Sequence, residues 1–259
     1  TMFYYCTGYG SPATYARVLD AAARRGVSSL AGLKVMDFGY GMIGQGRMMA
    51  SLGAEVHCVD PDTLLGALYS DAGDTGPVPR SDASPDDVRA GAPVGSLTVH
   101  TGRWPAEPEI TASVGGLYDL ILTKNTLKRG YIRPQRDADP RQLIDLGVPH
   151  DAFLRALHDA LKPGGLVVVY NISGRQNPPD QPYLPMADGV FPFTPAECAA
   201  AGLQVVALDE PDHAATLHIF RALGYAPPAA DAKPAEPAAN PATAPDFVAW
   251  VTVLRRAPE

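Results

Sequence analysis

The stretch VMDFGYGMIGQGRMMASLGAEVHCVD, residues 35–60, decides how this chain folds. An apolar segment runs into a glycine-rich turn, a helical pattern follows, and a second apolar segment ends in an acidic residue. Gly39, Gly41 and Gly44 have the spacing G-x-G-x-x-G, and Asp60 follows roughly 20 residues later. Glycines at such a turn let the backbone approach a ligand closely, and the helix directs its N-terminus at an anion. These residues therefore predict a strand–helix–strand unit that binds a small-molecule cofactor.

Short apolar runs alternate with amphipathic helical patterns along the rest of the chain. Such alternation predicts a parallel sheet with helices on both faces. The clearest helical pattern covers residues 151–162, with Asp151 placed to cap its start and Pro163-Gly164-Gly165 to end it. The predicted strands are LKVMDFG (33–39), AEVHCVD (54–60), SLTVHTG (96–102), YDLILTKN (118–125), GLVVVYNI (165–172), LQVVALD (203–209) and DFVAWVTVLRR (246–256). We therefore expect an α/β fold with a doubly wound, mostly parallel seven-stranded sheet.

The whole chain, residues 1–259, is expected to form one domain around this sheet. Within it we distinguish an N-terminal cap segment (1–33), a core (34–225), an Ala/Pro-rich loop (226–245) and the last strand (246–259). Two further segments interrupt the alternation. Residues 71–96 are rich in Gly, Pro and Asp and predict a long surface loop, and residues 174–195 mix prolines with aromatics, as lids often do.

Composition excludes several classes of protein. The formal net charge of −7 makes nucleic acid an unfavourable partner, because an acidic chain gains no counterion-release attraction to a polyphosphate. The three cysteines (Cys6, Cys58 and Cys198) are too scattered for a disulfide framework or a zinc site, and no histidine pair suggests a metal. No stretch is apolar enough to span a membrane. We expect a cytoplasmic protein without a metal, although a leader ahead of Thr1 stays open.

Two classes of cofactor fit the glycine turn, NAD and S-adenosylmethionine. Both need the glycines, and both use a carboxylate such as Asp60 on the ribose hydroxyls. Asp37 separates them, because a carboxylate two residues before Gly39 repels a pyrophosphate bound on the turn. The zwitterionic end of S-adenosylmethionine instead offers an ammonium to Asp37 and a carboxylate to the backbone N–H groups. A solvent-facing Asp37 without a ligand role is the alternative.

Residues 37–41, DFGYG, resemble the first motif of class I S-adenosylmethionine-dependent methyltransferases. Asp60 matches the ribose acid of that family, and residues 118–127 and 157–172 resemble its fourth-strand and fifth-strand motifs. The resemblance covers residues 34–208 in order, and it implies a methyltransferase with S-adenosylmethionine as cofactor. The cofactor-binding residues that it implies are Asp37, Gly39, Tyr40, Gly41, Gly44, Asp60, Pro61, Gly102, Arg103 and Trp104.

The chain departs from the family pattern in two places. Ile43 stands where the family has its third glycine, so the turn is expected to differ in shape. The stretch HTGRWP (100–105) lacks the acidic residue that reaches the adenine amino group in many members. Arg103 or Trp104 stacking on the adenine, or backbone bonds from Thr101 and Gly102, are the replacements to consider, and a hydrophobic plug is the other interpretation of Trp104.

The carboxyl ends of parallel strands mark the place for chemistry. Lys124 and Asn125, after the predicted fourth strand, are expected nearest the reactive methyl, and with Lys128 they could hold an anionic or carbonyl-bearing acceptor. His100 is the histidine best placed to act as a base, with a structural role as the alternative. The N-terminal tyrosines are expected either to wall the crevice or to pack against the sheet, and they are Tyr4, Tyr5, Tyr9 and Tyr15.

The acceptor is expected to be a small molecule or a peptide. Enzymes that methylate nucleobase amino groups usually carry [DN]-P-P-[YF] after the fourth strand, where this chain has TKNTLK. NPPD occurs later, at residues 177–180, and is interpreted as part of the lid. Two alternatives stay open: an NAD-dependent oxidoreductase, which would need a histidine–acid pair for its substrate, and a domain that binds S-adenosylmethionine without transferring a methyl group.

Overall fold

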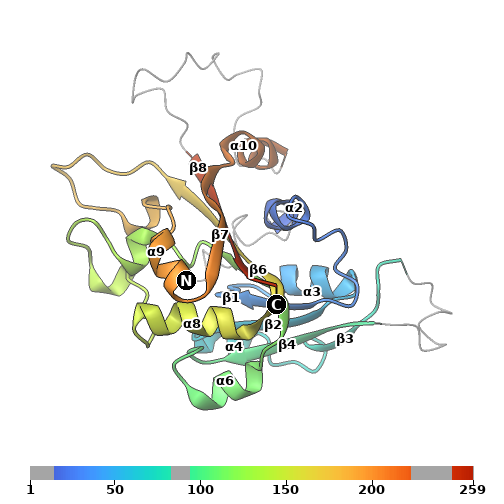
Figure 1. Ribbon diagram of the computed structural model, residues 1–259. Helices are drawn as coiled ribbons and strands as arrows, with labels where there is room; N and C mark the ends of the chain where they lie inside the picture. The colour runs from blue at the N-terminus through green and yellow to red at the C-terminus, as the bar shows by residue number, and fades with distance from the viewer. Residues whose placement is uncertain (1–14, 83–93, 223–246, 259) are drawn as a thin grey trace.

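The computed structural model describes residues 15–82, 94–222 and 247–258 (Figure 1). Its strands are β1 (Lys34–Phe38), β2 (Glu55–Asp60), β3 (Gly76–Val78), β4 (Gly95–Thr101), β5 (Tyr118–Lys124), β6 (Leu161–Gly174), β7 (Leu203–Pro211) and β8 (Phe247–Arg256). Its helices are α2 (Ala16–Ala23), α3 (Gly44–Ser51), α4 (Thr63–Leu68), α6 (Pro108–Val114), α7 (Arg129–Ile132), α8 (His150–Ala160), α9 (Pro195–Ala200) and α10 (His213–Ala222). Two short 3-10 helices are η3 (Pro140–Gln142) and η4 (Pro185–Ala187). The predicted loop at residues 226–245 lies outside the described residues.

All the strands belong to one sheet of order β3-β4-β2-β1-β5-β6-β8-β7. β4, β2, β1, β5 and β6 pair in parallel, while β8 lies antiparallel between β6 and β7. The prediction of an α/β fold with a doubly wound, mostly parallel sheet is confirmed. The order reverses between β1 and β5, which are neighbours although β2 and β4 come between them in sequence. A crevice at the carboxyl ends of strands is expected at this reversal.

The sheet has eight strands in place of the expected seven. The additional strand, β3, lies in the segment 71–96 that was predicted to be a loop. It pairs antiparallel with β4 through Gly76 and Leu97 and forms the edge of the sheet. A strand of three residues with a central proline carries too short a pattern to be recognised from sequence, and proline is tolerated there because an edge strand leaves one side unpaired.

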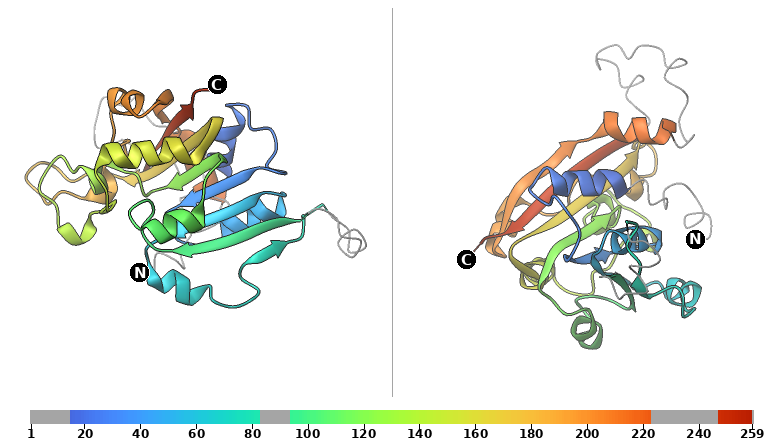
Figure 2. Two further views of the ribbon diagram at one scale, coloured as in Figure 1. Left: turned by 60° about the horizontal axis from the view of Figure 1, so that its bottom comes forward. Right: turned by 90° about the vertical axis from the view of Figure 1, so that its right-hand side faces the viewer.

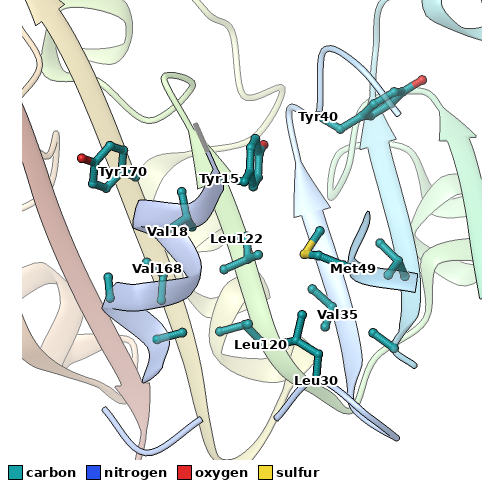
Figure 3. Packing of buried hydrophobic residues seen from close by; sticks show 14 of the residues in the cluster. Tyr15, Val18, Leu30, Val35, Tyr40, Met49, Leu120, Leu122, Val168 and Tyr170 are labelled. Carbon is teal, nitrogen blue, oxygen red and sulfur yellow. The ribbon is translucent and has the colours of Figure 1, made fainter. Parts of the chain in front are cut away.

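Each face of the sheet buries its own hydrophobic cluster. The left view of Figure 2 shows α8 across one face, and the right view shows α2 across the opposite one. On the first face Met36 and Phe38 of β1 pack with residues of α8 and α9. On the second face Val35 packs with residues of α2 and α3, and Figure 3 shows Val18 of α2 directed at the strands that carry Leu120 and Val168. Alternate residues of a strand therefore belong to different faces, as the strand period requires.

Helix α8 confirms the predicted helix and corrects its start. The chain forms a helix from His150 to Ala160, and Phe153, Leu154 and Leu157 are buried against the sheet. Asp151 was predicted to cap the helix, but Pro149 occupies the cap position and Asp151 lies in the first turn. There its carboxylate faces the positive end of the helix dipole and pairs with Arg155.

Within the described residues, no helix is both long and apolar enough to cross a membrane.

A buried ion pair fixes α2 to the start of α10. The Arg17 guanidinium donates to both carboxylate oxygens of Asp212, at 2.8 and 2.7 Å. The Tyr170 hydroxyl donates to the same carboxylate at 2.6 Å, so a strand and two helices share one acceptor. Asp212 is 9% exposed, which leaves water little opportunity to replace these partners.

Replacing Asp212 with Asn is expected to lower the free energy of unfolding by about 1–3 kcal/mol, because Arg17 and Tyr170 lose a charged acceptor inside the protein. Urea unfolding followed by circular dichroism measures the change. Asp82→Asn is the matched control, because Asp82 pairs with Arg80 in a solvent-facing position and is 65% exposed. An Asp212→Asn variant no less stable than Asp82→Asn would contradict the assignment.

Candidate functional site

A pocket of about 910 Å³ opens at the carboxyl ends of the parallel strands, beside the reversal in strand order. Its volume lies in the range of roughly 300–1,000 Å³ that small-molecule sites occupy. One side of its wall, where the sequence predicts the cofactor and which is called the cofactor side below, consists of Phe38, Gly39, Gly41, Val59, Asp60, Pro61, Gly102, Arg103 and Trp104. The opposite side consists of Asn125, Thr126, Lys128, Tyr131, Arg141, Gln142, Leu143, Ile144, Asp145, Leu146, Ile172 and Met186.

The glycine turn after β1 adopts backbone angles that other residues resist. Gly39 has φ +71° and Gly41 has φ +60°, both in the left-handed region. A Cβ atom on Gly39 would lie 2.2 Å from the Thr126 hydroxyl oxygen, so the loop after β5 leaves space only for hydrogen. From inside α3, the Gln45 amide donates to Asp37 Oδ2 at 3.2 Å and also bonds to the Tyr40 carbonyl. The turn is therefore fixed from both sides.

Asp60 ends β2 on the pocket wall. One carboxylate oxygen accepts the Asp62 N–H at 2.9 Å, which fixes the orientation of the side chain. Burial raises the pKa of Asp60, while the N–H groups of Asp62 and Gly41 act in the opposite direction. An oriented, half-buried carboxylate in this place is suited to accept hydrogen bonds from a pair of hydroxyl groups.

Aromatic rings line the pocket below the loop after β4. Trp104 is 3% exposed and meets Phe38 edge-on, with ring centroids 5.9 Å apart, and Phe153 at 6.0 Å. Because Trp104 also lines the pocket, the hydrophobic-plug interpretation and a ligand contact are compatible. At the rim, Arg103 pairs with Asp145 at 2.9 Å, and this ion pair joins the loop after β4 to the loop before α8.

Asn125 links the ends of β5 and β6. Its φ of +62° lies in the left-handed region, which asparagine tolerates better than most residues. The side-chain oxygen accepts the Ile172 N–H at 2.7 Å, and the Asn125 N–H donates to the Tyr170 carbonyl at 3.0 Å. The residue is thus held rigidly where the pocket wall passes from one strand to the next.

Lys128 is buried in the wall, with an exposed fraction of 2%. Its Nζ donates to the carbonyl oxygens of Ile172 at 2.5 Å and Met186 at 3.0 Å. The second bond attaches the segment 174–195 to the sheet. The outer part of that segment is held by Arg136, whose guanidinium donates to four carbonyl oxygens, those of Asn177, Pro178, Pro179 and Gln181.

The structure places eight of the thirteen predicted site residues on the pocket wall, namely Gly39, Gly41, Asp60, Pro61, Gly102, Arg103, Trp104 and Asn125. The other five lie off the wall, namely Asp37, Tyr40, Gly44, Lys124 and His100. Tyr40 is buried among the residues under α3, with its ring 6.4 Å from that of Tyr69. Gly44 begins α3, behind the turn. The chemical roles of the residues on the wall stay predictions.

Asp37 and Lys124 are off the wall because of strand alternation. Phe38 faces the pocket side of β1, so Asp37 faces the opposite side, where it accepts a hydrogen bond from Tyr15 at 2.9 Å. Asp37 is fully buried, and burial raises its pKa to about 7. Lys124 lies on the same side of β5, 5.8 Å from the centre of the Tyr15 ring, and burial lowers its pKa to about 8. Asp37 therefore does not line the pocket, and its expected contact with a ligand ammonium stays a prediction.

Tyr15 packs against the sheet, which is one of the two alternatives for the N-terminal tyrosines. Tyr4, Tyr5 and Tyr9 lie outside the described residues.

His100 does not face the pocket, contrary to the prediction. Its ring stacks on that of His57, with centroids 5.2 Å apart, and its Nε2 lies 3.0 Å from His57 Nδ1. Its Nδ1 bonds to the Ser113 hydroxyl at 3.0 Å, so both ring nitrogens are engaged under α6. Burial, together with nearby His57 and Lys34, lowers the pKa of His100 to about 4. The ring is held as a neutral structural group.

Two further segments contribute to the wall of the pocket. The loop that carries η3 contributes residues 141–146, and η4 contributes Met186. The lid prediction identified the second segment, but the first carries no motif that marks it. Asn177 and Asp180, the ends of NPPD, do not line the pocket, and the interpretation of that stretch as lid stays a prediction. Among the described residues, no cluster of His, Cys, Asp and Glu is suited to hold a metal ion.

No protein-family model matches the sequence. No curated protein is similar enough in sequence to count as a relative.

Solved structures do resemble the chain. Phosphoethanolamine N-methyltransferase 2 from Haemonchus contortus, in complex with phosphomonomethylethanolamine and S-adenosylhomocysteine, aligns with a TM-score of 0.52 and 16% identity, over 95% of this chain and 53% of that one. Magnesium protoporphyrin IX methyltransferase from Synechocystis PCC 6803, with S-adenosylmethionine bound, aligns with a TM-score of 0.44 and 13% identity, over 95% of this chain and 80% of that one. The chain has the fold of class I S-adenosylmethionine-dependent methyltransferases.

Gly39→Ala is expected to destabilise the protein by more than about 1 kcal/mol, because alanine resists a positive φ and its methyl group would collide with Thr126. Thermal unfolding by calorimetry measures the loss. Gly73→Ala is the control, since a Cβ there would meet no atom within 4 Å. Equal stability of the two variants would show that the turn has more space than the structure gives it.

Lowering the pH is expected to reduce the free energy of unfolding, because His100 resists protonation in the folded protein. Its pKa is lowered from 6.5 to about 4 in the folded protein, so the unfolded chain binds more protons between these pH values. The resulting stabilisation is complete above pH 6.5 and is lost as the pH falls towards 4, by up to about 3 kcal/mol. In urea unfolding across this pH range, the free energy of unfolding of His100→Asn should depend less steeply on pH than that of the wild type. His218→Asn, on exposed His218 of α10, should keep the wild-type slope.

Proposed function

We propose that the protein binds S-adenosylmethionine and transfers its methyl group to a small-molecule acceptor. One observation carries the proposal: the glycine turn after β1 and the carboxylate after β2 line one wall of a single pocket at the reversal in strand order. Methyltransferases of this fold, including the Haemonchus contortus enzyme with its S-adenosylhomocysteine, support the choice of cofactor. When bound, the cofactor supplies a methyl group on a sulfonium that is open to in-line displacement.

The cofactor side of the wall offers a partner for each part of such a molecule. Asp60 would accept bonds from the ribose hydroxyls, since its carboxylate is oriented by Asp62 and lines the pocket. Phe38 and Trp104 offer apolar rings for the adenine. The backbone at Gly39 and Gly41 can approach the amino-acid end closely, because neither residue carries a side chain.

The opposite side of the pocket wall, called the acceptor side below, would position a second molecule. Methyl transfer mainly requires that two reactants be held in line, and orientation can supply roughly 7–11 kcal/mol of the barrier. Asn125 and Thr126 join the two halves of the pocket, and Asn125 is fixed to β6 by its bonds to Ile172 and Tyr170. α7 and the segment 174–195 enclose this end, which favours a small acceptor over a peptide.

The glycine spacing followed by Asp60 also favours a second candidate, an NAD-dependent oxidoreductase. That reaction was expected to require a histidine–acid pair beside the substrate. Of the histidines in the described residues none lines the pocket, and the His57–Glu55 pair belongs to the first half of β2, away from the carboxyl ends of the strands where the pocket opens. The methyltransferase proposal is therefore preferred.

Isothermal calorimetry tests the cofactor. S-adenosylhomocysteine is expected to bind and NAD is not, and Asp60→Ala should weaken binding by about 10–100-fold because a charged acceptor is lost. Asp159→Asn, on the exposed side of α8, should leave the affinity unchanged. Binding of NAD alone would support the oxidoreductase, and binding of neither compound would reject the proposed cofactor. Binding of S-adenosylhomocysteine without methyl transfer to any acceptor in a labelled-donor assay would leave a non-catalytic domain.

A further inference from the structure

Lys128 is a basic side chain inside the pocket wall with no carboxylate hydrogen-bonded to it among the described residues. Its ammonium group has three N–H donors, and two of them bond to the carbonyl oxygens of Ile172 and Met186. Carbonyl oxygens satisfy hydrogen bonds but carry no net charge. A buried charge is costly unless an opposite charge compensates it, so this position favours an anion.

The carboxylates of the pocket wall and of the segment 174–195 have other partners. On the pocket wall, Asp60 accepts the Asp62 N–H and Asp145 pairs with Arg103. Asp188, on the segment 174–195, accepts the Arg129 guanidinium at 2.9 Å and the Tyr183 hydroxyl at 2.5 Å. Asp188 is near enough to attract Lys128, but no hydrogen bond joins the two side chains in the described residues. The compensating charge is therefore expected to come from a ligand.

The residues that line the pocket together with Lys128 indicate the chemistry of the rest of that ligand. The pocket that Lys128 lines is also lined by apolar side chains from three parts of the chain, namely Leu143, Ile144, Leu146, Ile172 and Met186. Met186 is 52% exposed, so its side chain is accessible to an apolar molecule in the pocket. Lys128 is therefore part of a pocket with a largely apolar wall.

We propose that Lys128 binds the carboxylate or phosphate group of a methyl acceptor whose body is apolar. The proposal rests on the proposed function, because it assigns this end of the pocket to the acceptor. It makes Lys128 a substrate-binding residue and gives the acceptor a chemical class: an apolar molecule with one anionic group.

The electrostatics of Lys128 agree with this role. Its pKa is lowered to about 7, mainly by burial and in part by Lys124 on β5, while Asp188 acts in the opposite direction. Tyr131 of α7 lies beside it, with its ring centre 5.5 Å from Nζ. An anion bound at Nζ stabilises the protonated form, so binding is linked to proton uptake. The affinity for an anion is therefore expected to fall as the pH is raised through the pKa of Lys128.

Two probes of equal length separate charge from apolar contact. Hexanoate and its neutral analogue hexanamide are titrated by calorimetry into protein saturated with S-adenosylhomocysteine, which fills the cofactor side. At about pH 6.5 the wild type should bind hexanoate about ten-fold more tightly or better, as a charge-assisted bond in a buried site allows. Lys128→Met should abolish this preference and retain the affinity for S-adenosylhomocysteine. Lys34→Met is the matched control, since Lys34 also donates to a backbone carbonyl, at the amino end of the sheet.

A pH series on the wild type provides a second measurement that does not depend on how Lys128→Met folds. The preference for hexanoate should decline between about pH 6 and about pH 9, where hexanoate stays ionised and only the lysine changes. Three results would each overturn the proposal and leave the cofactor assignment unchanged. They are equal affinities for the two probes, a preference for hexanoate that persists in folded Lys128→Met, and a preference for hexanoate that does not decline as the pH is raised. Failure to bind S-adenosylhomocysteine would instead reject the proposed function, and the acceptor site with it.

Discussion

The close approach of Gly39 and Thr126 is the constraint on which the pocket depends. The turn after β1 and the loop after β5 leave neighbouring strands at the reversal of strand order, and they meet at a distance that admits no Cβ atom on Gly39. The two halves of the pocket are joined at this contact. The carboxylate after β2 lies on one side of it, and the bridge from Asn125 to Ile172 lies on the other.

The cofactor side of the pocket was largely predictable, because it consists of residues near each other in sequence. The spacing of Gly39, Gly41 and Asp60, together with the parallel order of the strands, indicated which loops would meet. Two predicted residues on this side do not line the pocket. Asp37 and Tyr40 belong to the right segment, but the alternation of side chains along β1 and the packing under α3 turn them away from the pocket. A sequence pattern locates a strand end more reliably than it tells which face a particular side chain occupies.

The acceptor side was less predictable, because contacts between distant parts of the chain create it. Lys128 was one of several polar residues after a predicted strand, and only its bonds to Ile172 and Met186 distinguish it from Lys124, which faces the opposite side of the sheet. The loop that carries η3 has no motif, and β3 is too short to show a pattern. His100 ends a strand at the expected edge, but its partner His57 comes from another strand and gives it a structural role. Pairings of this kind are decided by tertiary packing.

The loops on the two sides of the pocket are held by contacts of different strength. Next to the acceptor side, Arg136 donates hydrogen bonds to four carbonyl oxygens, and Lys128 donates a further one to the carbonyl oxygen of Met186. Next to the cofactor side, Arg103 and Asp145 form a single ion pair with half or more of each side chain in water, worth about 0–1 kcal/mol and weakened further by salt. Raising the ionic strength is therefore expected to weaken the contact at Arg103–Asp145 and to leave the hydrogen bonds of Arg136 and Lys128 largely unchanged.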